Sequence, residues 1–258
     1  MEEITDSHVH LDLIARNHPE KIQWLKQNRC AVVSWAYLGR ADSVSALEAG
    51  LADHARCIRR HASEGLKCHC LTGIHPRSIP PDLQPEQIRP MLEAGLEDTL
   101  CRGIGEIGLE TGDGREQEIF IAQLELAVAL LKPGQIIGIH TPRSNKPSLT
   151  KTTLAILDGF QDMCASIVVD HCTVETIDHV LKAGFRAGVT LSPAKTSWNE
   201  LKRIVARHGD QIPRIMCNTD SGSEFYDDVV RFSRNAELPA AIREKIFHRN
   251  AARFFSIQ

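Results

Sequence analysis

The stretch "REQEIFIAQLELAVALLKPGQIIGIH" (115–140) decides the fold class, because it joins a helical pattern to a strand pattern that ends in a histidine. Ile119, Leu126 and Leu130 recur at helical spacing, which predicts an amphipathic helix over 115–131. The short apolar run "QIIGIH" (135–140) predicts a buried strand. Helices that alternate with buried strands are typical of parallel α/β folds.

The same alternation runs along the whole chain. Seven further strand-like runs lie at 2–10, 30–37, 67–75, 100–108, 166–171, 186–192 and 213–220. A helical pattern between two of them is expected to begin at Thr173 and end at Gly184. No linker, repeat or low-complexity segment interrupts the 258 residues. The sequence therefore predicts one α/β domain over 1–258, a (β/α)8 barrel of TIM type.

The composition indicates in which compartment the protein works and which partners it is not expected to bind. The formal net charge is -3, which argues against strong nonspecific binding to a nucleic-acid backbone. No run approaches the roughly 20 apolar residues of a membrane span, and the polar N-terminus is unlike a secretory signal. Eight widely spread cysteines indicate free thiols in a reducing compartment. We therefore expect a cytoplasmic protein without a membrane partner.

Two short motifs each allow a second interpretation. "KCHC" (67–70) could be a metal clip, but it lacks a partner motif, which favours ordinary strand residues. "GIGEIG" (103–108) matches a dinucleotide fingerprint, yet a loop rather than a helix follows it. We interpret these glycines as allowing close backbone approach while Glu106 reaches into a site.

Ionisable residues gather at the ends of the predicted strands. They are His8, His10, His75, Glu106, His140, His171 and Asp220. The C-terminal ends of all strands meet on one face of a barrel, where active sites lie. The alternative for the first pair alone, in "TDSHVHLD" (5–12), is a polar strand end with two solvated histidines. The convergence from several strands favours a metal site.

Six of these residues suit a divalent metal: His8, His10, Glu106, His140, His171 and Asp220. Histidines and carboxylates without thiolates fit zinc, manganese, nickel or magnesium. One ion needs three or four protein ligands, so this surplus suggests two ions that share Glu106. Two such ions can activate a water molecule, and Asp220 is placed to accept its proton. Glu110 lies past the strand and is expected to stay outside the ligand set.

Substrate contacts are predicted from loops beyond the strands. Arg143, Lys146 and Lys195 suit a phosphate or carboxylate group, although each alone could be a solvated loop charge. His75 in "GIHP" is a candidate substrate contact, or else a turn histidine fixed by Pro76.

Six motifs together, "DSHVHL", "GIHP", "GEIGLE", "IHTPR", "DHC" and "NTD", resemble those of the TatD family of metal-dependent hydrolases. The resemblance covers essentially the whole chain and implies a distorted (β/α)8 barrel with one or two divalent ions. It implies that His8, His10, Glu106 and Asp220 hold one ion. It also implies that Glu106, His140 and His171 hold the other. Members of the family are associated with DNase or exonuclease activity, and some with other hydrolyses.

The chain differs from the usual family pattern at three places. Glu110 replaces the aspartate of "GEIGLD", and Pro142 moves the arginine to Arg143, three residues after His140. Ser221-Gly222 follows Asp220, where a turn with proline is common. The differences fall in loops rather than among the predicted ligands.

Three functions remain open from the sequence. The first is a metal-dependent phosphoesterase or nuclease. The second is a hydrolase of a C–N or C–O bond in a small molecule, which the acidic net charge and the 5% aromatic content favour. Only Trp35, Tyr37 and Trp198 are expected near the open face as stacking platforms. The third is a metal-binding scaffold without activity, for which Asp220 as a base would be superfluous.

Overall fold

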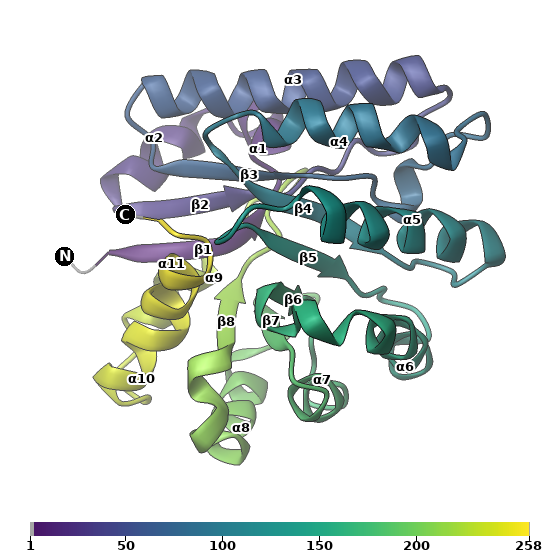
Figure 1. The fold of residues 1–258 in the computed structure, drawn as a ribbon. Helices are drawn as coiled ribbons and strands as arrows, with labels where there is room; N and C mark the ends of the chain where they lie inside the picture. Colours follow the sequence, from purple (N-terminus) through teal and green to yellow (C-terminus); the bar gives the residue numbers. More distant parts are fainter. Residues whose placement is uncertain (1–2, 258) are drawn as a thin grey trace.

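The computed structural model describes residues 3–257 and contains eight parallel strands with helices around them (Figure 1). The strands are β1 (Ile4–Val9), β2 (Cys30–Ser34), β3 (Cys68–Thr72), β4 (Cys101–Gly108), β5 (Ile136–His140), β6 (Ile167–Val169), β7 (Arg186–Thr190) and β8 (Ile215–Asn218). They are hydrogen-bonded in chain order, and each is nearly or wholly buried, as parallel strands between a barrel core and a helix layer must be. The (β/α)8 architecture is confirmed.

Helices connect and flank the strands. They are α1 (Leu11–Asn17), α2 (Glu20–Gln27), α3 (Val44–Ser63), α4 (Ile88–Leu96), α5 (Gly114–Leu130), α6 (Lys146–Leu157), α7 (Ile177–Lys182), α8 (Trp198–Arg207), α9 (Asp228–Ser233), α10 (Ala240–Glu244) and α11 (Asn250–Phe254). A π-helical turn, η5 (Lys245–Arg249), joins α10 to α11. Within residues 3–257, none of the helices has both the length and the apolar character that a bilayer span requires.

The ends of three predicted segments, one helix and two strands, need correction. The helix expected to begin at Thr173 begins at Ile177, because the Thr173 carbonyl accepts bonds from Thr176 and Ile177 in a preceding turn. The strands expected to end at His171 and Asp220 stop earlier, at Val169 and Asn218. Both residues have a positive φ, +58° for His171 and +53° for Asp220, which leaves the extended conformation and ends the strand.

The two ambiguous motifs lie in strands. "KCHC" overlaps β3, where Cys68 and Cys70 are buried free thiols. "GIGEIG" lies wholly within β4, and α5 starts only at Gly114, so no helix opens at these glycines. Both structural interpretations are confirmed.

Apolar side chains fill part of the barrel interior. Trp35, which directly follows β2, packs with Leu71, Met216 and Phe255 in one apolar cluster. Gly138 leaves the space for Trp35, since a Cβ on Gly138 would lie 2.5 Å from its ring. The polar residues gather toward the C-terminal ends of the strands.

The joint between β8 and β1 differs from the other seven. Among the described residues, no strand ladder joins them, and a single bridge pairs Val9 with Ser221. Side chains hold the rest of this seam: Asp6 accepts bonds from the Thr219 amide (2.9 Å) and hydroxyl (2.6 Å). The barrel is therefore nearly closed, with one joint made mostly by side chains.

Candidate metal centre

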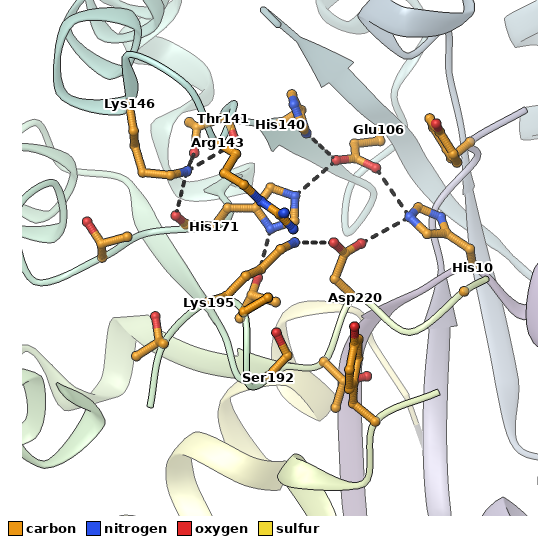
Figure 2. A pocket seen from close by; sticks show the side chains of 18 of the residues that line it. His10, Glu106, His140, Thr141, Arg143, Lys146, His171, Ser192, Lys195 and Asp220 are labelled. Atoms are coloured by element: carbon orange, nitrogen blue, oxygen red, sulfur yellow. Dashed lines mark hydrogen bonds and ion pairs between the residues drawn. The ribbon is translucent and has the colours of Figure 1, made fainter. Parts of the chain in front are cut away.

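Glu106 in β4 is the centre of the site, with 1% of its surface exposed. Its Oε1 atom lies 2.6 Å from His140 Nδ1 and 3.2 Å from His171 Nε2. Its Oε2 atom lies 3.2 Å from His8 Nε2 and 3.9 Å from His10 Nε2. Figure 2 shows His10, His140 and His171 directed toward this carboxylate. Residues from β1, β4 and β5 and the loop after β6 are thus brought to one point, as the sequence predicts.

The second ring nitrogen of each of these four histidines is held by another group. His8 Nδ1 donates to Asp170 Oδ2 at 2.5 Å, and His10 Nδ1 donates to the Trp35 carbonyl at 3.0 Å. This leaves the Nε2 atom of both rings directed at the carboxylates. A ring nitrogen fixed in this way is the usual arrangement behind a metal-binding histidine.

The other two rings are held in the same manner. His171 Nδ1 lies 2.7 Å from the Thr190 hydroxyl, and His140 Nε2 lies 2.9 Å from Glu110 Oε2. His171 therefore presents Nε2 to the centre, whereas His140 presents Nδ1.

The donor set fits a divalent cation. His8 Nε2 and Glu106 Oε2 are buried and face each other at 3.2 Å, yet neither has a hydrogen-bond partner in residues 3–257. Three groups of ligand atoms lie close enough to hold an ion: His8 with His10 and Asp220, His8 with Asp170 and His171, and His75 with Glu106 and His140. Nitrogen and carboxylate oxygen atoms without thiolates match zinc, manganese and other borderline or hard divalent ions.

Asp220, just beyond β8, completes the site on the far side of His10. Its Oδ1 atom lies 3.0 Å from His10 Nε2, and its Oδ2 atom accepts a bond from the Lys195 ammonium. The left-handed backbone at Asp220 turns its carboxylate toward the barrel axis, where Figure 2 shows it between His10 and Lys195. One carboxylate thus connects the histidine cluster to a cation.

Electrostatics favour a positive charge at this centre. Burial alone would lower the pKa of His8, but the Glu106 carboxylate, aided by Asp170, raises it to about 10. The pKa of Glu106 stays well below its usual value, because the charges of His8 and His140 outweigh its burial. A buried anion that attracts a proton so strongly also attracts a divalent cation.

His75 lies beside the centre but is held differently. It follows β3, its Nε2 atom is 3.7 Å from Glu106 Oε1, and its ring contacts that of Tyr37. Its Nδ1 atom accepts a bond from the Arg77 amide, so the neutral ring carries its proton on Nε2. Burial lowers the pKa of His75 well below its usual value, which keeps it neutral. We therefore interpret His75 as a hydrogen-bond donor toward the centre rather than a ligand.

A cavity of about 670 Å³ opens above these residues. All three predicted cations line it, but their situations differ. Lys146 donates to the carbonyls of Thr141 (3.2 Å) and His171 (2.9 Å), which ties together the loops after β5 and β6. Lys195 is paired with Asp220. Arg143 is exposed. Its side chain makes no hydrogen bond or ion pair with any of residues 3–257.

Two of the expected aromatic platforms are not available. Trp35 is 1% exposed and stacks on the His8 ring, with 4.1 Å between ring centroids. Trp198 packs on Phe232, at 4.9 Å between centroids. Tyr37 lines the cavity, as does Tyr226, which the sequence did not single out. The exposed aromatic surface at this face is therefore small.

Comparisons with known proteins agree with this geometry. The family model "TatD related DNase" matches residues 5–246. An uncharacterised metal-dependent hydrolase of Methanocaldococcus jannaschii is 26% identical over 194 residues, which is 75% of this chain and 70% of that protein. Among solved structures, a TatD-like protein from Archaeoglobus fulgidus is 29% identical with a TM-score of 0.75, covering 98% of this chain and 100% of that one.

More distant structures share the fold alone. A TatD homologue from Escherichia coli is 15% identical with a TM-score of 0.60, covering 98% of this chain and 94% of that one. A 5-carboxyvanillate decarboxylase from Sphingomonas paucimobilis is 14% identical with a TM-score of 0.66, covering 99% of both chains.

Proposed function

Because this chain belongs to the TatD related DNase family of metal-dependent hydrolases, we propose that it hydrolyses phosphoester bonds with water. The observation that carries the proposal is the convergence of four fixed histidine nitrogens on the single buried carboxylate of Glu106. In the proposed ligand set, His8, His10, Glu106 and Asp220 hold one divalent ion. Glu106, His140 and His171 hold a second ion.

Divalent ions at this centre supply Lewis acidity that activates water and offsets charge on the phosphoryl oxygens. Asp220 accepts a proton from the attacking water, since its carboxylate is ionised and lies at the open side of the cluster. His75 donates from Nε2 to an oxygen of the substrate. Arg143 binds the anionic group of the substrate, with Lys195 close to Asp220.

We predict that the purified protein binds two divalent ions per chain. The six proposed ligands exceed what one ion requires, and the two oxygens of Glu106 face different histidines. Elemental analysis of protein loaded with Zn²⁺ or Mn²⁺ and then desalted measures the ratio directly. A ratio of one ion per chain after saturation would disprove the two-ion model.

The activity itself is tested with a substrate panel. We expect Zn²⁺-, Mn²⁺-, Ni²⁺- or Mg²⁺-loaded protein to release phosphate or nucleotides from phosphomonoesters, single-stranded DNA or both. Chelator-treated protein is the control. A panel in which only amides or carboxylic esters react would replace the phosphoesterase proposal with hydrolysis of a C–N or C–O bond.

That second function has two observations in its favour. The cavity lining includes the carboxylates of Glu175, Glu200 and Glu224, which would repel the flanking phosphates of a DNA strand. With Trp35 buried, stacking surface for single-stranded bases is also small. The panel therefore needs small substrates as well as DNA.

Arg143→Ala is expected to raise KM about 10- to 100-fold for anionic substrates, because a hydrogen bond to a charged group contributes about 1.5–3 kcal/mol. Its kcat should change little, since within residues 3–257 Arg143 makes no hydrogen bond or ion pair with the proposed ligands. Steady-state kinetics on anionic and neutral substrates measure both terms. Arg40→Ala, at an exposed position outside the cavity lining, is the matched control. An unchanged KM for every anionic substrate would remove Arg143 from substrate binding.

A further inference from the structure

The four proposed ligand histidines fall into two classes by what holds their outer nitrogen. His10 and His171 have neutral oxygens as their hydrogen-bond partners, a carbonyl and a hydroxyl, although Asp170 Oδ2 also lies 3.6 Å from His171 Nδ1. His8 and His140 are held by carboxylates, those of Asp170 and Glu110. A carboxylate behind a ligand histidine fixes the tautomer and makes the imidazole a stronger donor to a metal.

The surroundings of Asp170 hold this carboxylate in place. Asp170 is fully buried, and its Oδ1 atom accepts a bond from Asn218 Nδ2 at 2.8 Å. Gly188 on the adjacent strand has no side chain, and any Cβ there would collide with the Asp170 carboxylate. The backbone carbonyl of Asp170 accepts a bond from the Thr141 hydroxyl at 2.7 Å. These contacts hold the Asp170 carboxylate with Oδ2 at 2.5 Å from His8 Nδ1.

Glu110 reaches His140 from the loop after β4. Its Oε2 atom accepts from His140 Nε2, and its Oε1 atom accepts from Arg77 at 2.7 Å. Its backbone amide is bonded to Glu116 Oε2 at 2.8 Å, which fixes the loop. Glu110 is thus outside the proposed ligand set, as expected from the sequence, but directly behind one of its members.

The two carboxylates act on different sides of Glu106. His8 lies against Glu106 Oε2, whereas His140 lies against Oε1. We propose that Asp170 and Glu110 are positioning residues that act mainly on different metal positions, Asp170 through its 2.5 Å bond to His8 and Glu110 through its 2.9 Å bond to His140. The inference rests on the proposed ligand set but not on the identity of the substrate.

The test measures metal binding without any substrate. Zn²⁺ is titrated against a competing chelator into the variants Asp170→Asn and Glu110→Gln, with the number of ions per chain determined in parallel. Trp35 stacks on His8, so its fluorescence is expected to report the position that contains His8. A Trp24→Phe, Trp198→Phe background isolates that signal.

Each variant is expected to weaken one binding step about 10- to 100-fold, the usual effect of removing a partner behind a ligand histidine. Asp170→Asn should shift the step that changes Trp35 fluorescence, and Glu110→Gln should shift the other step. Two variants that weaken the same step equally, or that leave both steps unchanged, overturn the proposal. The proposal is also overturned if the wild-type protein binds one ion per chain, because there is then no second binding step that Glu110 could affect.

Folding controls keep the Asp170 result interpretable. Asp170 is buried, so thermal unfolding of metal-depleted Asp170→Asn must match wild type before its affinity is compared. Asn218→Ala is the second variant, since it removes the bond to Asp170 Oδ1 while leaving Asp170 and His8 in place. It should weaken the same step as Asp170→Asn, by a smaller factor. If Asn218→Ala weakens the Glu110 step instead, the assignment is wrong.

The outcome is independent of the phosphoester proposal. Selective shifts in the two binding steps together with no phosphoester turnover would refute the proposed substrate and retain the proposed positioning roles. If the wild type hydrolyses phosphoesters but each variant weakens both binding steps equally, the proposed substrate is retained and the proposed positioning roles are refuted.

Discussion

Asp220→Asn is expected to lower kcat by about 10²- to 10⁴-fold, the range in which a positioned general base contributes to catalysis. The amide cannot accept the proton of the attacking water, although it can still contact His10 and Lys195. KM should change far less, because Asp220 is proposed to act on water rather than on the substrate. Steady-state kinetics on the best substrate of the panel measure both terms.

Asparagine is the right replacement at this position for a conformational reason. Asp220 has φ of +53°, and Asn is one of the few residues that adopt this left-handed region readily. An alanine there would add backbone strain to the chemical loss. Because Asp220 is also a proposed ligand, ion content must be measured on the same sample. Near-normal turnover by a fully loaded Asp220→Asn protein would show that another base operates.

Glu106→Gln is expected to remove most bound metal at both positions. Glu106 touches all four proposed ligand histidines, and the glutamine amide supplies neither the charge nor two equivalent acceptor oxygens. Elemental analysis after loading and desalting should show a large loss, with activity lost in proportion. Circular dichroism of the metal-depleted protein checks that the barrel is intact.

The matched variant is Glu110→Asp, which keeps the charge and lies outside the proposed ligand set. It should retain much more metal than Glu106→Gln, because water can reach the half-buried Glu110 position. Full ion content in Glu106→Gln would mean that Glu106 only supports the site and that the ions are bound elsewhere.

The sequence predicts the barrel and the gathering of polar residues well, for a simple reason. Apolar strand runs and helical periodicity are local, and the barrel topology brings their C-terminal ends together wherever those ends lie in the chain. His140 and Glu106 could be placed on one face without any knowledge of distances. The exact ends of β6 and β8 could not, because the left-handed backbone at His171 and Asp220 has no local signal in the sequence.

The groups behind the histidines were also missed, since each comes from a distant segment. Asp170 is 162 residues from His8 and reads as part of a buried strand. Its only sequence signal is a carboxylate in an apolar run, which must be paired in the folded protein. Lys146 lines the cavity, where a substrate contact is expected from the sequence, and two backbone carbonyls accept hydrogen bonds from its ammonium group.

The seam between β8 and β1 couples metal binding to the folding of the barrel. His8 and His10 belong to the β1 side of this joint and Asp220 to the β8 side. An ion bound by all three residues would therefore link the two sides. By mass action, any ligand that binds only the closed joint disfavours every opened form of it. The opening of β1 from β8 would then become rarer as the ion concentration rises, and the amide hydrogens of the two strands would exchange with solvent more slowly. The β8–β1 joint would thus be stabilised only in those molecules that hold the ion.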